Sequence, residues 1–201
     1  MTELATDRRD RKHDLGLRTG RGDETDLTWR VLGTLNLFRL LVAIVLLGLF
    51  FAASDPRFFG DRYPEVFAAT AAGYLVFAVV SGLAIGQRRV NAGAQSATQI
   101  VVDIVAIVTL MHASGGISSG LGGLLVVFVG ASSLVLPYQA PTFFAALATL
   151  GVLGEQIFSQ LGGASNTAQY PAAGVLGAII FAIALAAKPL ARRIQVSEAL
   201  A

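Results

Sequence analysis

Four ionisable side chains lie within, or at the end of, long apolar stretches: Arg39, Asp103, His112 and Glu155. A charge in the hydrocarbon centre of a membrane costs about 2.5–3.5 kcal/mol, so such residues usually face protein and pair with one another. Arg39 and Asp103 each follow the start of an apolar stretch by seven residues, which is about 10 Å of helix. We therefore predict an Arg39–Asp103 ion pair between two helices, acting as a structural clamp or as part of a switch.

A second pair is expected at the other end of these stretches. Glu155 lies about one helical turn before the end of its stretch, at a depth close to that of His112. We expect a hydrogen bond between them, which would form a proton-sensitive latch because histidine titrates near neutral pH. The alternative is that His112 is an interfacial residue in contact with water. The chain has no cysteine, and we expect no catalytic residue, metal site or cofactor in it.

The segment HASGGISSGLGG, residues 112–123, contains five glycines and three serines. Glycine adopts left-handed backbone angles, so the chain turns sharply there or admits a close neighbour. The segment is either a plain hairpin loop or a signal-sensing or packing element at the membrane face, and we favour the second. Its candidate sensing residues are Ser114, Gly115, Gly116, Ser118, Ser119 and Gly120.

The composition indicates which elements position these residues. The 201 residues are 54% hydrophobic and 14% charged, against about 25% charged in soluble domains. Residues 1–28 mix both charge signs with few apolar side chains, which predicts a disordered tail. Six apolar segments follow, and each is predicted to cross the membrane as a helix. They cover residues 32–53, 66–85, 96–111, 121–136, 142–158 and 172–190. The predicted fold is an all-α membrane protein, a bundle of six transmembrane helices over residues 29–190, followed by a cytoplasmic exit helix over residues 191–201.

The positive charges predict the orientation, because cytoplasmic loops carry an excess of Lys and Arg. One side collects Arg30, Arg88, Arg89, Lys188, Arg192 and Arg193. Both termini are therefore expected in the cytoplasm and the glycine-rich segment outside. The outer loops have about a dozen residues or fewer, too few to fold independently. Any signal would then be read by the membrane bundle or at its outer rim, in contact with membrane lipid.

Small residues recur every four positions along the last span, at Gly174, Ala178, Ala182 and Ala186. Such a ridge lets another helix approach closely, more commonly within a bundle than at a dimer seam. The following residues, KPLARRIQVSEALA, place apolar side chains at helical spacing and predict the first turns of an amphipathic helix. Since this helix stops with the sequence, we expect the chain to be a fragment or a truncated form that precedes an output domain.

Four segments carry a family resemblance: NLFRLLVAIVLL (36–47), QIVVDIVAIVTLMHASGGISSGLGGLLVV (99–127), LATLGVLGEQ (147–156) and ARRIQVSEALA (191–201). Together they resemble the membrane-sensor region of PilS-type sensor histidine kinases in the NtrB-like group, and MHASGGISSGLG is the most specific part. The resemblance implies a signal-sensing module in the bacterial inner membrane, a homodimer, and an intramembrane protein ligand such as a pilin. It also implies control of type IV pilus genes through a response regulator that the output domain phosphorylates.

The chain contains no phospho-acceptor histidine motif and no ATP-binding glycine boxes, so we do not expect it to be an enzyme by itself; the parent family is an ATP-dependent kinase. The alternative function is a small transporter or channel subunit whose Arg39, Asp103 and Glu155 line a polar path. A membrane enzyme would need several convergent acids or histidines, and only His112 and Glu155 qualify. The sequence shows no basic face of the kind that binds nucleic acid, so we expect no nucleic-acid partner.

Overall fold

The computed structural model describes residues 29–52, 59–87, 92–135, 140–162 and 169–198. Over these ranges the chain forms six α-helices, one short 3-10 helix and no strand, so the expected all-α class is confirmed. The elements are a first helix Trp29–Ala52, α2 Pro64–Gln87, α3 Ala92–Ala113, η1 Gly116–Ser119, α4 Gly122–Val135, α5 Ala140–Leu161 and α6 Tyr170–Glu198. The tail predicted at residues 1–28 lies outside the described residues.

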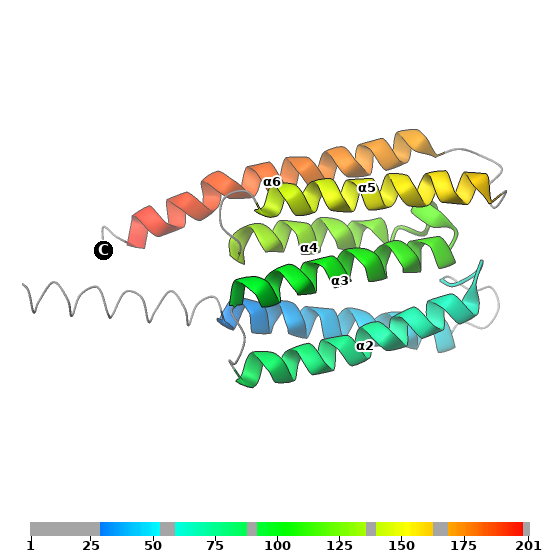
Figure 1. Cartoon of the computed structure of the whole chain (residues 1–201), viewed down its shortest axis with the longest axis horizontal. Helices are drawn as coiled ribbons and strands as arrows, with labels where there is room; N and C mark the ends of the chain where they lie inside the picture. Colours follow the sequence, from blue (N-terminus) through cyan, green and yellow to red (C-terminus); the bar gives the residue numbers. More distant parts are fainter. Residues whose placement is uncertain (1–28, 53–58, 88–91, 136–139, 163–168, 199–201) are drawn as a thin grey trace, which may run out of the picture.

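The α3 helix is the centre of the bundle. It packs against α2, α4 and α5, while α6 packs against α4 and α5. The first helix joins this group through side chains such as Phe38, whose ring centroid lies 5.6 Å from that of Phe128 in α4. Figure 1 shows α5 and α6 on one side of α3, with α2 and the first helix on the other. A residue on α3 can therefore contact helices from both halves of the chain.

The distribution of side chains is that of a membrane bundle, in which apolar groups face lipid and polar groups face the interior. Large apolar side chains such as Leu41, Val80 and Leu150 are exposed, with 57%, 57% and 65% of their surface accessible. Arg39 and Asp103, by contrast, are buried. The first helix, α2, α3 and α5 are each long and apolar enough to cross a membrane, and shorter apolar helices cover 122–131 and 170–186.

Two predicted spans were too short. Residues 96–111 and 142–158 belong to α3 and α5, each of 22 residues, or about 33 Å of helix. Their polar ends, including Gln95 and Ser159, are buried in the bundle, so the helix continues where hydropathy falls. Pro141 lies in the first turn of α5, where its lack of an N–H group costs no hydrogen bond. The α4 helix remains short, at 14 residues.

The ridge predicted on the last span does not pack inside the bundle. The four residues Gly174, Ala178, Ala182 and Ala186 are exposed. The face of α6 that packs inside the bundle lies about 100° around the helix and contains Ala173, Gly177, Ile180 and Ala184. A Cβ atom added at Gly177 would lie 2.5 Å from the Thr149 methyl group, so this glycine permits the close contact between α5 and α6.

The exit helix predicted to start at residue 191 is the continuation of the last span. The α6 helix runs from Tyr170 to Glu198 in one piece. Figure 1 shows its last turns extending beyond the ends of the neighbouring helices. A displacement of α6 inside the bundle would therefore be carried directly beyond it.

Candidate functional site

The predicted ion pair between Arg39 and Asp103 is confirmed as a contact. The Arg39 Nε and Nη2 atoms donate to Asp103 Oδ1 and Oδ2 at 2.6 and 2.5 Å. This two-pronged geometry is the strongest that a guanidinium and a carboxylate form. The two side chains are only 2% and 1% exposed, so bulk water hardly reaches either charge. The pair joins the first helix to α3 at the centre of the bundle.

Tyr74 and Asn36 extend this pair to a third helix. The Tyr74 hydroxyl of α2 donates to Asp103 Oδ1 at 2.7 Å. Arg39 Nη1 donates to Asn36 Oδ1 at 3.3 Å, and the same Asn36 side chain donates from Nδ2 to the Ala78 carbonyl at 3.1 Å. We call Asn36, Arg39, Tyr74 and Asp103 the polar clamp. Asn36 has the i, i+3 spacing to Arg39 that favours contact on one helix face, a signal that sequence inspection could have used.

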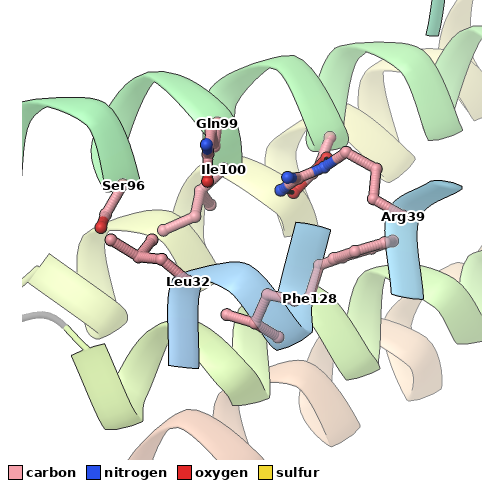
Figure 2. Close-up of a pocket in the computed structure, with 8 residues that line it drawn as sticks. Leu32, Arg39, Ser96, Gln99, Ile100 and Phe128 are labelled. Carbon is pink, nitrogen blue, oxygen red and sulfur yellow. Dashed lines mark hydrogen bonds and ion pairs between the residues drawn. The ribbon is translucent and has the colours of Figure 1, made fainter. Parts of the chain in front are cut away.

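Aromatic rings cover the remaining faces of the guanidinium. The Arg39 Cζ atom lies 5.6 Å from the ring centroid of Phe128 in α4 and 5.9 Å from that of Phe77 in α2, within the range of cation–π attraction. Beside the guanidinium is a cavity of about 10 Å³ lined by Leu32, Leu35, Arg39, Ser96, Gln99, Ile100, Asp103 and Phe128. Figure 2 shows how Leu32 and Phe128 border this cavity opposite Gln99 and Ile100. A volume of this size accommodates about one water molecule.

The second predicted contact, between His112 and Glu155, is also present. His112 Nδ1 lies 3.3 Å from Glu155 Oε1, which joins the end of α3 to α5. The imidazole stacks on Tyr63 with a centroid distance of 5.4 Å, and the Phe158 ring meets it edge-on at 5.5 Å. The His112 side chain is 22% exposed, whereas that of Glu155 is 2% exposed. Water can therefore reach the histidine but hardly reaches the carboxylate. We call this pair the outer latch.

The glycine-rich segment closes over the outer latch. Three of its five glycines, Gly115, Gly116 and Gly120, have φ angles of 88°, 81° and 73°, which a side chain would disfavour. A Cβ atom at Gly116 would lie 3.5 Å from both Glu155 carboxylate oxygens. The segment therefore joins α3 to α4 and lies against the buried Glu155 carboxylate.

The serines of the segment hold its backbone and one neighbouring loop. The hydroxyls of Ser118 and Ser119 donate to the carbonyls of Gly115 and Gly116 at 3.1 and 2.7 Å. The Gly60 N–H donates to Ser114 Oγ at 3.0 Å. The amides of residues 62 and 63 both donate to the Ala113 carbonyl, each at 3.1 Å. The loop before α2 thus satisfies the end of α3, which the sequence did not reveal.

Arg62 adds a positive charge at this end of the bundle. Its Nη1 atom donates to Ser159 Oγ at 2.6 Å, and Ser159 lies one helical turn after Glu155 on α5. Two buried atoms have no hydrogen-bond partner among the described residues here, Arg62 Nη2 and Glu155 Oε2. An open donor and an open acceptor at one end of the bundle are what a polar ligand or a proton could engage. Arg62 was not among the candidate residues predicted from the sequence.

The arrangement separates the charges into two groups along α3. Asp103 and His112 lie on the same helix nine residues apart, a rise of about 13.5 Å. Arg39 and Asp103 are bound to each other, and Glu155 faces His112, so the three intramembrane charges are used in contacts between helices. Among the described residues, no group of three or more His, Asp or Glu side chains could hold a metal ion.

Comparisons with known proteins agree with this architecture. The family of PilS-like transmembrane domains matches residues 21–201. The chain is 32% identical over 175 residues to the Sensor protein kinase PilS of Pseudomonas aeruginosa, an alignment that covers 86% of this chain. The chain spans 32% of the length of that relative. No solved structure matches the chain. The resemblance seen in the sequence is confirmed, and the chain belongs to the family of PilS-like transmembrane domains.

Proposed function

We propose that this chain is the membrane-embedded signal-sensing module of a two-component sensor histidine kinase that controls type IV pilus genes through a response regulator. The family match and the relative's name, a sensor protein kinase, support this function. The observation that carries the mechanism is the position of α3. This one helix holds the polar clamp to the first helix and α2, and the outer latch to α5.

The proposed topology has six spans in the inner membrane with both termini in the cytoplasm. It rests on the charge bias described above and on the placement of the glycine-rich segment at the opposite end of the bundle from the start of the first helix (Figure 1). In this topology the outer latch faces the exterior, and Arg62 and Glu155 hold buried hydrogen-bonding atoms there that have no partner among the described residues. The signal is read there, and the candidate residues of the glycine-rich segment border it.

Signal transmission follows the contacts between helices. A ligand or proton that changes the His112–Glu155 contact shifts α5 relative to α3. The α5 helix contacts α6 closely at Gly177 and Thr149, and α6 leaves the bundle as a continuous helix. The module thus has two packing states of α5 and α6, and the signal changes their populations. The polar clamp holds the first helix, α2 and α3 together, so that α5 and α6 move relative to them.

The proposed partners follow from the exposed face of α6. The ridge of Gly174, Ala178, Ala182 and Ala186 is exposed and has the spacing that lets helices pack closely in membranes. We assign it to a homodimer seam, which brings two exit helices together at the start of the output domains. A pilin is the proposed intramembrane protein ligand. The response regulator would be contacted only through an output domain.

A chimaera tests this function in cells. The chain replaces the matching region of the Sensor protein kinase PilS in Pseudomonas aeruginosa, and a reporter reads transcription from a pilin promoter. We expect the chimaera to give regulated reporter activity, and Glu155→Gln to shift that activity at equal membrane abundance. Reporter activity that is independent of every substitution in the two polar sites would contradict the sensing function. A matched control is Gly73→Ala on the exposed face of α2, which adds one methyl group with no atom within 4 Å.

A further inference from the structure

A groove between α2 and α3 is lined by residues outside the polar clamp and the outer latch, although one of its walls, Phe77, also contacts Arg39. It encloses about 270 Å³ and is located where α2 ends and α3 begins. Its walls are Phe77, Val80, Ser81 and Ala84 of α2 with Ala94, Gln95, Thr98 and Gln99 of α3. Val80, Ala94 and Thr98 are exposed, so the groove opens to the outside of the bundle.

The groove contains a buried amide without a partner. Gln95, Gln99 and Asp103 follow each other at four-residue spacing on one face of α3. Asp103 accepts from the Tyr74 hydroxyl, and Gln99 Nε2 donates to Ser81 Oγ at 2.8 Å. The Gln95 side chain is only 9% exposed, yet neither its nitrogen nor its oxygen has a partner among the described residues.

The local sequence of α2 explains why this amide is left open. Tyr74 and Ser81 present hydroxyl groups to α3, but the next residue of α2 in the groove, Ala84, presents a methyl group. The small side chain both creates the groove and removes a partner for Gln95. A buried amide left unpaired is unfavourable, so a group from outside the chain should pair with it. That group must accept from Nε2 and donate to Oε1.

The surroundings identify the source of this group as the lipid bilayer. The outer faces of both helices beside the groove are apolar and exposed, as at Val76, Leu83 and Val105 with 63%, 64% and 60% of their surface accessible. Gln95 lies three residues after the start of α3, whereas Phe77 lies ten residues before the end of α2. Their depths are therefore about 4.5 and 15 Å from these helix ends. The groove is therefore polar at the rim of the bundle and apolar toward the membrane centre, as a phospholipid is.

We propose that this groove binds one glycerophospholipid whose headgroup carries a hydrogen-bond donor. The acyl chain lies along Phe77 and Val80. Gln95 Nε2 donates to a phosphate or ester oxygen, and Gln95 Oε1 accepts from the headgroup, either the hydroxyl of phosphatidylglycerol or the ammonium of phosphatidylethanolamine. Phosphatidylcholine has no such donor, so it can accept from Gln95 Nε2 but leaves Gln95 Oε1 without a partner.

Native mass spectrometry of the purified chain tests the site, with phosphatidylethanolamine, phosphatidylglycerol and phosphatidylcholine as probes added separately. We expect wild-type protein to bind one molecule of either of the first two lipids, and Gln95→Leu to bind it about tenfold more weakly, as the loss of intramembrane hydrogen bonds predicts. Ala84→Ser gives Gln95 an internal partner, so it should weaken lipid binding while the protein remains folded. Gln156→Leu removes another buried glutamine, 4% exposed in α5, and should leave lipid binding unchanged.

Three results would overturn the proposal. Equal binding by wild type, Gln95→Leu and Ala84→Ser would indicate adventitious lipid only. Phosphatidylcholine bound as tightly as the two donor lipids would show that Gln95 Oε1 is not engaged by a headgroup. Loss of a dimer peak in Gln95→Leu, with lipid binding unchanged, would assign the groove to a second copy of the chain.

Discussion

Asp103→Asn should strongly lower the free energy of unfolding, although it replaces only one carboxylate oxygen with an NH2 group. The side chain keeps its size and its contact with Tyr74, but the Arg39 guanidinium, 2% exposed, loses its counter-ion. An amide oxygen in the place of Oδ1 can still accept from Arg39 Nε, but an NH2 group in the place of Oδ2 cannot accept from Nη2. The other described partners of Arg39 are Asn36 Oδ1 at 3.3 Å and two aromatic rings. Breaking a buried ion pair on one side costs about 3–5 kcal/mol. Arg39→Met should cost a similar amount, because it leaves the carboxylate with Tyr74 alone.

The double variant Arg39→Met/Asp103→Asn distinguishes a charge effect from lost packing. Removing both charges is often nearly neutral, so we expect it to be more stable than either single variant, with a coupling energy of about 3 kcal/mol or more. Tyr74→Phe is the control for one hydrogen bond and should cost about 1 kcal/mol. Reversible unfolding in mixed micelles, followed by circular dichroism, measures all four free energies. A double variant whose loss equals the sum of the two single losses would refute the clamp as an interacting ion pair.

Three further predictions concern the outer latch and α6. Glu155→Gln weakens the contact with His112, so we expect amide hydrogen exchange in η1 to accelerate. The expected increase is about tenfold, which corresponds to the free energy of one hydrogen bond. Unchanged exchange would show that the latch does not hold this segment. Gly177→Ala should cost about 1–3 kcal/mol through overpacking. In the same unfolding measurement, Gly73→Ala should be neutral or stabilising because the added methyl group meets no atom within 4 Å; equal effects would contradict the described α5–α6 contact. Ala178→Cys should form a disulfide-linked dimer in oxidised membranes and the buried Ala173→Cys should not, whereas the opposite pattern would exclude the proposed seam.

Depth along a helix could be predicted from the sequence, and it identified both polar contacts. The rise per residue is fixed, so equal counts from the membrane surface place Arg39 level with Asp103, and His112 level with Glu155. The neutral partners could not be found this way. Tyr74 and Phe128 look like ordinary apolar residues of their spans, and their roles depend on which helices surround α3.

Helix rotation, in contrast, could not be predicted. The ridge from Gly174 to Ala186 has the correct period for helix packing, but a period does not say which neighbour the ridge faces. The packed face begins one residue earlier, at Ala173, because α6 contacts α4 and α5 from one direction only. The helix ends were misjudged for a related reason: buried polar residues such as Ser159 lower local hydropathy while the helix continues.

The central claim is that the outer latch controls the output of an attached kinase through α6. The most direct measurement is autophosphorylation of the chimaeric kinase in lipid nanodiscs, compared between wild type and Glu155→Gln at equal protein concentration. The account predicts that Glu155→Gln changes the initial rate several-fold in one direction, while Gly73→Ala leaves the rate unchanged. Identical rates in all three proteins, with the latch substitution confirmed to be folded, would contradict the account.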